Sequence, residues 1–222
     1  MATFGLPVLA AVCMWLVVSA HAWVLLWPAL VMIAVALVYV VKAPRAFGKR
    51  ADGTLPAWAW LLWGPWFAYM WIAHELARRA TREPVANEVA PRIWVGRRPR
   101  PGELPPGVSI LVDLCAEFPV ARGIACDYLT IPTLDATSPT VAQLQRAVDQ
   151  ILATDGNAFI HCAFGHGRSA TVAAAVLIRR GDATLDTVEA LMQAHRPRIG
   201  LNAIQRAMLR RAVSASPASP AT

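Results

Sequence analysis

Apolar residues are concentrated in the first third of the chain. No Asp, Glu, Lys or Arg interrupts the stretch from Leu6 to Val41. A helix that crosses a bilayer needs about 20 apolar residues, so this stretch is too long for one comfortable span. It predicts two membrane helices, over residues 6–20 and 23–41, joined by a turn near Ser19–His21. The alternatives are one long tilted helix and a cleaved signal peptide, and the lack of a basic start disfavours the latter.

A second apolar stretch, from Pro56 to Ala73, is rich in tryptophan. It contains five Trp residues together with Tyr69, and the pair Gly64–Pro65 interrupts it. Trp and Tyr gather at the membrane–water interface. Basic residues flank the stretch on both sides, so a full crossing would leave one basic flank outside, against the positive-inside tendency. We therefore expect residues 56–73 to be a re-entrant or interfacial element, with a third span or a soluble core element as the alternatives.

The pattern changes after a polar linker at residues 77–90, in which Pro84 ends a short helical signal. Short apolar runs, typical of buried strands, then alternate with segments of helical periodicity. This alternation predicts an α/β domain over residues 91–213, with a central, mostly parallel sheet flanked by helices. The domain would follow a membrane-associated helical region, residues 1–76. The tail at residues 214–222 has the composition of a disordered segment.

Net charge and cysteine spacing narrow the range of possible functions. The net charge is +7, and 56% of the residues are hydrophobic. Many basic residues flank the apolar segments, where the cytoplasmic face and its anionic lipids attract them. We therefore expect membrane lipid, and no nucleic acid, as a partner. The four cysteines show no paired spacing, which argues against a disulfide framework or a zinc knuckle.

The stretch HCAFGHGRS, from His161 to Ser169, carries the candidate chemistry. A short apolar strand runs into a loop of small residues that opens a helix. Backbone N–H groups in such a loop form a cradle for an anion, and the start of the helix adds partial positive charge. Cys162 begins the loop, and this positive field lowers the pKa of its thiol and favours the nucleophilic thiolate. Arg168 adds a planar guanidinium that binds two phosphate oxygens.

A Cys, five residues, an Arg and a Ser in this context resemble the active-site loop of the protein tyrosine phosphatase superfamily, most closely its dual-specificity branch. The resemblance covers about residues 90–213. It implies that Cys162 is the nucleophile, that Arg168 stabilises the transition state, and that Ser169 donates a hydrogen bond to the sulfur. His161 would orient the loop. The phosphate would be bound by the loop itself, namely Ala163, Phe164, Gly165, His166, Gly167 and Arg168. A plain helix cap for Ser169 and a structural role for His161 are the alternatives.

The family also places an Asp, as general acid, on a loop upstream of the cysteine. The stretch YLTIPTLD is similar to that loop, and it ends on Asp135. Asp127 and Asp113 are the competing candidates, although Asp113 lies at the end of a buried strand, which favours a structural role. The stretch that contains Asn202 and Gln205 matches the family loosely, and we expect capping and packing from both. The resemblance implies no metal and no organic cofactor.

The resemblance implies hydrolysis of phosphomonoesters and leaves the substrate open. Proteins phosphorylated on Tyr, Ser or Thr are the first expectation. A lipid phosphate is the alternative, because the stretches RIWVG and DYLTIP are similar to phosphatases that act on phosphatidylglycerophosphate. A phospho-binding pseudophosphatase and a sulfur-transfer or arsenate-reducing enzyme are further alternatives. Oxidants inactivate a low-pKa thiolate, so Cys162 requires a reducing compartment. We therefore expect a membrane protein whose catalytic domain faces the cytoplasm.

Overall fold

The structure is a computed structural model that describes residues 2–215, which form two compact units. The first, here the helical unit, contains the residues up to Arg50, residues 54–82 and residues 116–119. The second, here the sheet unit, contains residues 51–53, residues 83–115 and the residues from Val120 onward. The expected tail, 214–222, lies outside the described residues apart from Ser214 and Ala215, at the end of the last helix.

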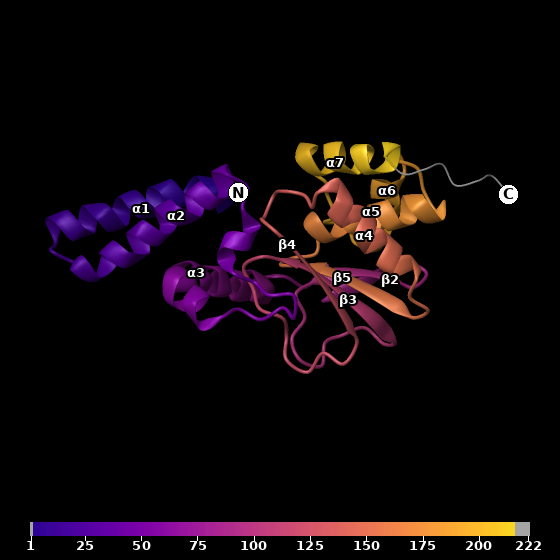
Figure 1. Cartoon of the computed structure of the whole chain (residues 1–222), viewed down its shortest axis with the longest axis horizontal. Helices are drawn as coiled ribbons and strands as arrows, with labels where there is room; N and C mark the ends of the chain where they lie inside the picture. The colour runs from indigo at the N-terminus through magenta and orange to yellow at the C-terminus, as the bar shows by residue number, and fades with distance from the viewer. Residues whose placement is uncertain (1, 216–222) are drawn as a thin grey trace. The chain divides into compact units, whose positions relative to one another are not determined.

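Two apolar helices begin the helical unit. Helix α1 (Ala2–Ser19) and helix α2 (Leu26–Val40) lie side by side in Figure 1 and are joined by a 3-10 turn, η1 (Trp23–Leu25). The chain reverses at His21, whose φ of +52° lies in the left-handed region. A second 3-10 turn, η2 (Pro44–Phe47), follows α2. Two helices and a turn therefore occur where the sequence predicts them, and their crossing of a bilayer stays a prediction.

Helix α3 (Ala57–Ala80) runs without interruption through Gly64–Pro65, where the sequence indicates a break. A proline inside a helix removes one backbone hydrogen bond, and the packing of the flanking side chains offsets this loss. The helix also continues past the apolar stretch, where Glu75 and Arg79 form an ion pair one turn apart at 2.9 Å. Residues 77–80 of the expected linker therefore belong to α3.

Helix α3 has one buried and one exposed face. Trp66 and Phe67 are fully buried, whereas Leu61 and Leu76 are 76% and 62% exposed. Among the described residues, the helical segment Trp23–Val40 is long and apolar enough to cross a membrane, with a mean hydropathy of 2.4, and α3 is not. Exposed apolar faces of this kind are typical of surfaces that contact lipid or another protein.

Residues 116–119 follow a strand of the sheet unit but pack with the helices. Phe118 is fully buried. Its ring contacts Trp71 edge to face, with the ring centres 5.8 Å apart, and lies 5.1 Å from the ring of His74. Aromatic contacts of this geometry add to the free energy that burial itself supplies. Residues 116–119 therefore belong to the packed core of the helical unit.

The sheet unit contains five strands in the order β1-β2-β5-β3-β4. Strands β2, β5, β3 and β4 are parallel, and β1 pairs antiparallel with β2 at the edge. This arrangement confirms the mostly parallel sheet that the sequence predicts. The strands are β1 (Ala86–Ala90), β2 (Ile93–Arg97), β3 (Val108–Cys115), β4 (Asp127–Thr133) and β5 (Asn157–Cys162). Strand β1 lies in the expected linker. The sequence does not predict this strand, because a short strand at a sheet edge has a weak hydrophobic pattern.

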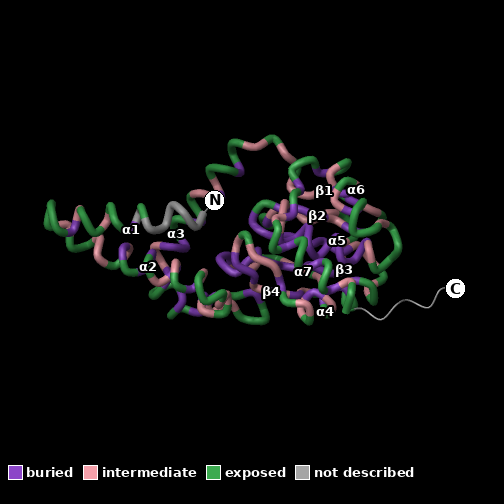
Figure 2. The backbone as a smooth tube through the Cα atoms, turned by 90° about the horizontal axis from the view of Figure 1, so that it is seen from above, coloured by how far each residue is buried: buried purple, intermediate pink, exposed green. Residues whose placement is uncertain are grey.

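Helices α5 and α6 contact the strands, α4 and α7 pack against α5, and Figure 1 shows all four above the strands. Helix α5 is central: its residues from Arg168 to Leu177 are all buried, and its small Ala and Val side chains allow a close approach to β5. Within the sheet unit, Figure 2 shows the buried residues gathered around α5 and the strands. The helices are α4 (Val141–Leu152), α5 (Arg168–Arg180), α6 (Val188–His195) and α7 (Ala203–Ser214).

The parallel strands bring their carboxyl ends to one edge of the sheet. Strand β5 ends on Cys162, which lies opposite Arg97, at the end of β2. Strand β3 ends on Cys115, which lies opposite Thr133, at the end of β4. In open α/β sheets ligands bind outside the carboxyl ends of the strands. The loop from Cys162 to Arg168 therefore stands where a ligand is expected.

Candidate active site

The loop between β5 and α5 is held by hydrogen bonds to its outward carbonyl groups. Every carbonyl from residue 163 to residue 167 accepts one: Ala163 O from Arg98 N at 3.3 Å, Phe164 O from Arg196 Nη2 at 2.9 Å, Gly165 O from Arg196 Nε at 3.0 Å, His166 O from Gly200 N at 3.1 Å and Gly167 O from Thr171 N at 2.8 Å. The N–H of a trans peptide points away from its C=O. The N–H groups of residues 164–168 are therefore directed to the inner side of the loop, as an anion requires.

Glycine at position 165 is required by two constraints. Its φ is +76°, and a Cβ built there would lie 2.3 Å from the carbonyl carbon of Gly96 on β2. That neighbour is backbone, so it has no side-chain freedom with which to move away. The loop thus curves tightly against β2, and the N–H of Gly165 reaches the Sγ of Cys162 at 3.2 Å.

Cys162 is 4% exposed and lies at the centre of this curve. Burial by itself raises the pKa of the thiol, but the charge of Arg168 and the hydrogen bonds from Ser169 and Gly165 outweigh it, so the pKa lies below its ordinary value. The Oγ of Ser169 is 3.5 Å from the sulfur. Ser169 lies inside α5, whose N-cap is Gly167, so the alternative of a plain helix cap is wrong. The arrangement favours the thiolate, which is the nucleophilic form.

Arg168 connects the loop to the ends of two other strands. Its Nη1 donates to the carbonyl of Thr133 at 2.8 Å and lies 3.5 Å from that of Leu114. Its Nη2 is 3.5 Å from Asp135 Oδ1. The guanidinium is 2% exposed, whereas the Asp135 side chain is 43% exposed and lies just beyond β4. The structure therefore brings Cys162, Arg168, Ser169 and Asp135 to one edge of the sheet.

The two competing acids have other positions. Asp127 begins β4, whose far end carries Thr133, so it lies about 20 Å along the strand from the edge that holds the loop, at about 3.3 Å per residue. Asp113 is 1% exposed and accepts hydrogen bonds from Cys115 N and Tyr128 Oη, both at 2.8 Å. Burial and the charge of Asp113 raise the pKa of Tyr128, which keeps this hydroxyl protonated as a donor. Asp113 is therefore a structural carboxylate.

His161 lies beneath the loop, beside Asp113. It is 2% exposed, and its Nε2 is 3.7 Å from Asp113 Oδ1. Among the described residues, Asp113, Cys115 and His161 form a buried group whose potential metal-ligand atoms all lie within 4.8 Å of one another. Both oxygens of Asp113 already accept hydrogen bonds from the protein. The Asp113 carboxylate is therefore already engaged by donors of the protein itself.

Residues with long-range contacts complete the site, and the sequence gives little sign of them. Arg196, which is fully buried, holds two carbonyls of the loop. Asn202 and Gln205 form the capping box of α7, as expected, and they also donate to the carbonyls of Ala136 and Thr137 at 2.8 and 3.0 Å. These two bonds fix the segment that follows Asp135. A fully buried Arg and two side-chain amides thus position the loops around the sulfur.

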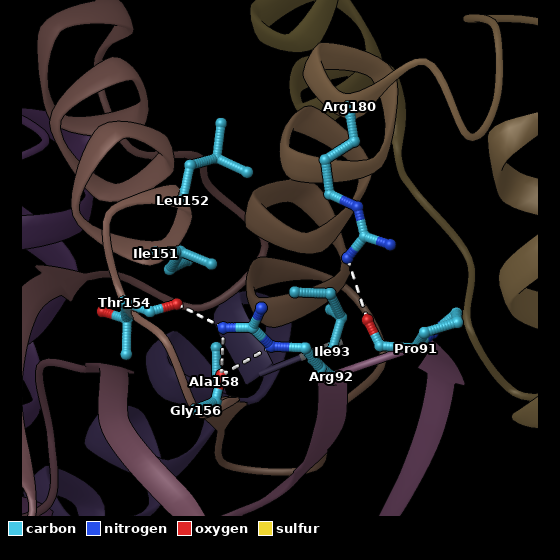
Figure 3. Close-up of a pocket in the computed structure, with 9 residues that line it drawn as sticks. All are labelled: Pro91, Arg92, Ile93, Ile151, Leu152, Thr154, Gly156, Ala158 and Arg180. Atoms are coloured by element: carbon cyan, nitrogen blue, oxygen red, sulfur yellow. Dashed lines mark hydrogen bonds between the residues drawn. The ribbon is translucent and has the colours of Figure 1, made fainter.

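Figure 3 shows a cavity at the opposite end of β2 and β5. Its volume is about 180 Å³, and two of its lining residues, Ile93 and Ala158, pair across β2 and β5 four residues before Arg97 and Cys162. The guanidinium of Arg92 donates to the carbonyls of Thr154 and Gly156, and the Nη1 of Arg180 donates to that of Pro91. Both guanidinium groups thus hydrogen-bond to backbone carbonyls around the cavity. The cavity lies apart from the loop between β5 and α5.

A family model described as the catalytic domain of dual specificity phosphatases matches residues 111–214. No curated protein matches the chain. Among solved structures, human DUSP28 is similar at 22% identity and a TM-score of 0.52, over 60% of this chain and 95% of that one.

Two further structures share the fold. Tk-PTP in its active form is 22% identical, with a TM-score of 0.52, over 60% of this chain and 99% of that one. PTPMT1 in complex with PI(5)P is 17% identical, with a TM-score of 0.51, over 59% of this chain and 95% of that one. With the family match, they show that the sheet unit has the fold of a dual-specificity phosphatase catalytic domain and that residues 111–214 are similar to that family.

Proposed function

We propose that this chain is a membrane-anchored phosphatase that hydrolyses phosphomonoesters through a phosphocysteine intermediate. The observation that carries the proposal is the position of the Cys162 sulfur. It lies inside a loop whose five outward carbonyls are all bonded, beside Arg168 and on the same sheet edge as Asp135.

In the first step, the inward N–H groups and Arg168 hold the three non-bridging oxygens of the phosphate. The Cys162 thiolate attacks phosphorus, and the bond from phosphorus to the ester oxygen breaks. Asp135, in its acid form, gives its proton to the leaving oxygen. Because most of the stabilisation comes from donors already in place, the loop offers it without reorganisation.

In the second step, water attacks phosphorus, and the Asp135 carboxylate takes the proton of this water. The phosphorus–sulfur bond breaks, and inorganic phosphate leaves. The electron pair returns to the sulfur as a thiolate, which the hydroxyl of Ser169 stabilises from 3.5 Å. The reaction thus balances with water as the only co-reactant.

Membrane anchoring rests on the apolar helices of the helical unit. Exposed apolar side chains occur on all three helices, among them Trp15, Val18, Leu30, Ile33, Leu37, Leu61 and Ile72. A soluble protein rarely exposes this much apolar surface. The basic residues near these helices agree with an anionic cytoplasmic surface, and we infer that the catalytic domain faces the cytoplasm.

Phosphorylated proteins are the first proposed substrate class, and a lipid phosphate such as phosphatidylglycerophosphate is the second. The second is supported by the exposed apolar helices and by the similarity of fold to PTPMT1, whose structure is with PI(5)P. A membrane anchor raises the effective concentration of lipid headgroups at the active site.

The test is phosphate release by the full-length protein, purified in detergent and free of metal. A phosphotyrosine peptide and phosphatidylglycerophosphate are compared side by side, with Cys162→Ser as the control. We expect release that Cys162→Ser abolishes, and the faster substrate identifies the class. Equal release by Cys162→Ser, or no release on either substrate, would contradict the proposal.

A further inference from the structure

Glu83 contacts the phosphate loop from a part of the chain that no sequence motif connects to it. It precedes β1 and belongs to the sheet unit. Its Oε2 accepts a hydrogen bond from His166 Nε2 at 2.7 Å and lies 3.3 Å from Arg196 Nη2. Its side chain is 13% exposed and that of Arg196 is fully buried, so water screens this pair weakly.

His166 is a point at which the middle of the loop is held by its own side chain. It stands between Gly165 and Gly167, which have no side chains, and its own ring points to Glu83. An ionised carboxylate only accepts hydrogen bonds, so Nε2 of the ring carries the proton. Burial lowers the pKa of His166 against the opposing effect of Glu83, and the ring is therefore neutral at neutral pH. The bond thus fixes the ring in one tautomer.

Arg196 connects the Glu83 carboxylate to the two residues before His166. Its Nε and Nη2 donate to the carbonyls of Gly165 and Phe164 at 3.0 and 2.9 Å. Its Nη1 donates to Asn87 Oδ1 at 2.8 Å and to the carbonyl of Pro84 at 3.2 Å. Glu83 supplies negative charge to this buried cation, which would otherwise be costly.

We propose that Glu83 is a positioning residue of the phosphate loop: through His166 and Arg196 it keeps three consecutive loop residues in the conformation that turns their N–H groups to the phosphate. The proposal rests on the proposed function, because it assigns the loop to phosphate. Glu83 touches neither substrate nor the reacting atoms in this account. It acts by holding the donors in place before the substrate binds.

Electrostatics and positioning predict opposite results for the loss of Glu83. If the carboxylate acted only as a nearby negative charge, its removal would make the site more positive and strengthen the binding of an anion. If it positions the loop, its removal loosens the converging N–H groups and weakens that binding. The sign of the change in anion affinity therefore separates the two roles.

The experiment measures tungstate binding by calorimetry, and p-nitrophenyl phosphate hydrolysis, with the full-length protein in detergent. The variants are Glu83→Ala and Glu83→Gln, with Glu88→Gln as the matched control, since Glu88 accepts from the backbone of Arg92 and is exposed on β1. We expect Glu83→Ala to weaken tungstate binding and lower kcat/KM about tenfold or more. The tungstate affinity and kcat/KM of Glu83→Gln should lie between those of the wild type and of Glu83→Ala, because the amide oxygen still accepts a hydrogen bond from His166.

Unchanged or tighter tungstate binding in both Glu83 variants would overturn the proposal, and so would a loss of melting temperature without a loss of tungstate affinity. If Glu83→Ala fails to fold, Glu83→Gln decides by the same criteria. If the wild-type protein binds tungstate but hydrolyses nothing, the proposed function fails, whereas the role of Glu83 is still decided by the tungstate affinities.

Discussion

Replacing Ser169 with alanine removes one of the groups that stabilise the charged sulfur of Cys162. The Oγ of Ser169 lies 3.5 Å from Sγ, and the residue is fully buried. The charge of Arg168 and the hydrogen bond from Gly165 N remain in the variant. A hydrogen bond to a charged group contributes about 1.5 kcal/mol, which is about tenfold in the equilibrium between thiol and thiolate.

The direction of the pH effect follows from the sign of the pKa change. The pKa of Cys162 is lowered in the folded protein, so the thiolate contributes stability that is fully present above the unfolded pKa and is lost as the pH falls through the folded pKa. In Ser169→Ala this pKa rises toward its ordinary value. The acid limb of the kcat/KM profile therefore moves to higher pH.

The assay is the rate at which iodoacetamide alkylates Cys162 at a slightly acidic pH, followed by mass spectrometry of the Cys162 peptide. This readout distinguishes Cys162 from the other three cysteines, Cys13, Cys115 and Cys126. We expect the rate to fall about tenfold in Ser169→Ala. An unchanged rate, together with an unchanged acid limb, would refute the role assigned to the hydroxyl.

Three further substitutions test other parts of the structure. Asp135→Asn should lower kcat about a hundredfold for alkyl phosphates, which need a proton on the leaving oxygen, and less for p-nitrophenyl phosphate; an equal loss on both would contradict its role as the acid. Gly165→Ala should abolish tungstate binding, because its Cβ would meet the backbone of Gly96, and calorimetry that shows normal affinity would contradict this. Phe118→Ala should lower the free energy of unfolding by about 3–5 kcal/mol in denaturant titrations, and a loss below about 1 kcal/mol would contradict the packing of its ring with Trp71.

The features that the sequence predicts well are those with a local pattern. The parallel sheet follows from short apolar runs that alternate with helices, and the tight loop between β5 and α5 follows from the nine residues His161–Ser169. Asp135 is the preferred acid because of its loop, and the structure places it 3.5 Å from Arg168. For the sheet and the loop, neighbours in the chain supply both the residues and the geometry, whereas the approach of Asp135 to Arg168 depends on the pairing of the strands.

The features that the sequence does not predict depend on residues far apart in the chain. Arg196 lies 31 positions after Gly165, whose carbonyl it holds, and Glu83 lies 83 positions before His166. Neither contact leaves a periodic signal, since each uses one side chain from an otherwise ordinary loop. The packing of residues 116–119 with the helical unit is similar, because Phe118 alone gives no sign of the rings of Trp71 and His74.

The most direct test of the mechanism is the covalent intermediate itself. The full-length protein in detergent is mixed with p-nitrophenyl phosphate, quenched in acid during turnover, and digested for mass spectrometry. We predict one phosphoryl group on the peptide that contains Cys162, and none on that peptide in Cys162→Ser. Turnover with no phosphoryl group on Cys162, or with the group on another residue, would contradict it.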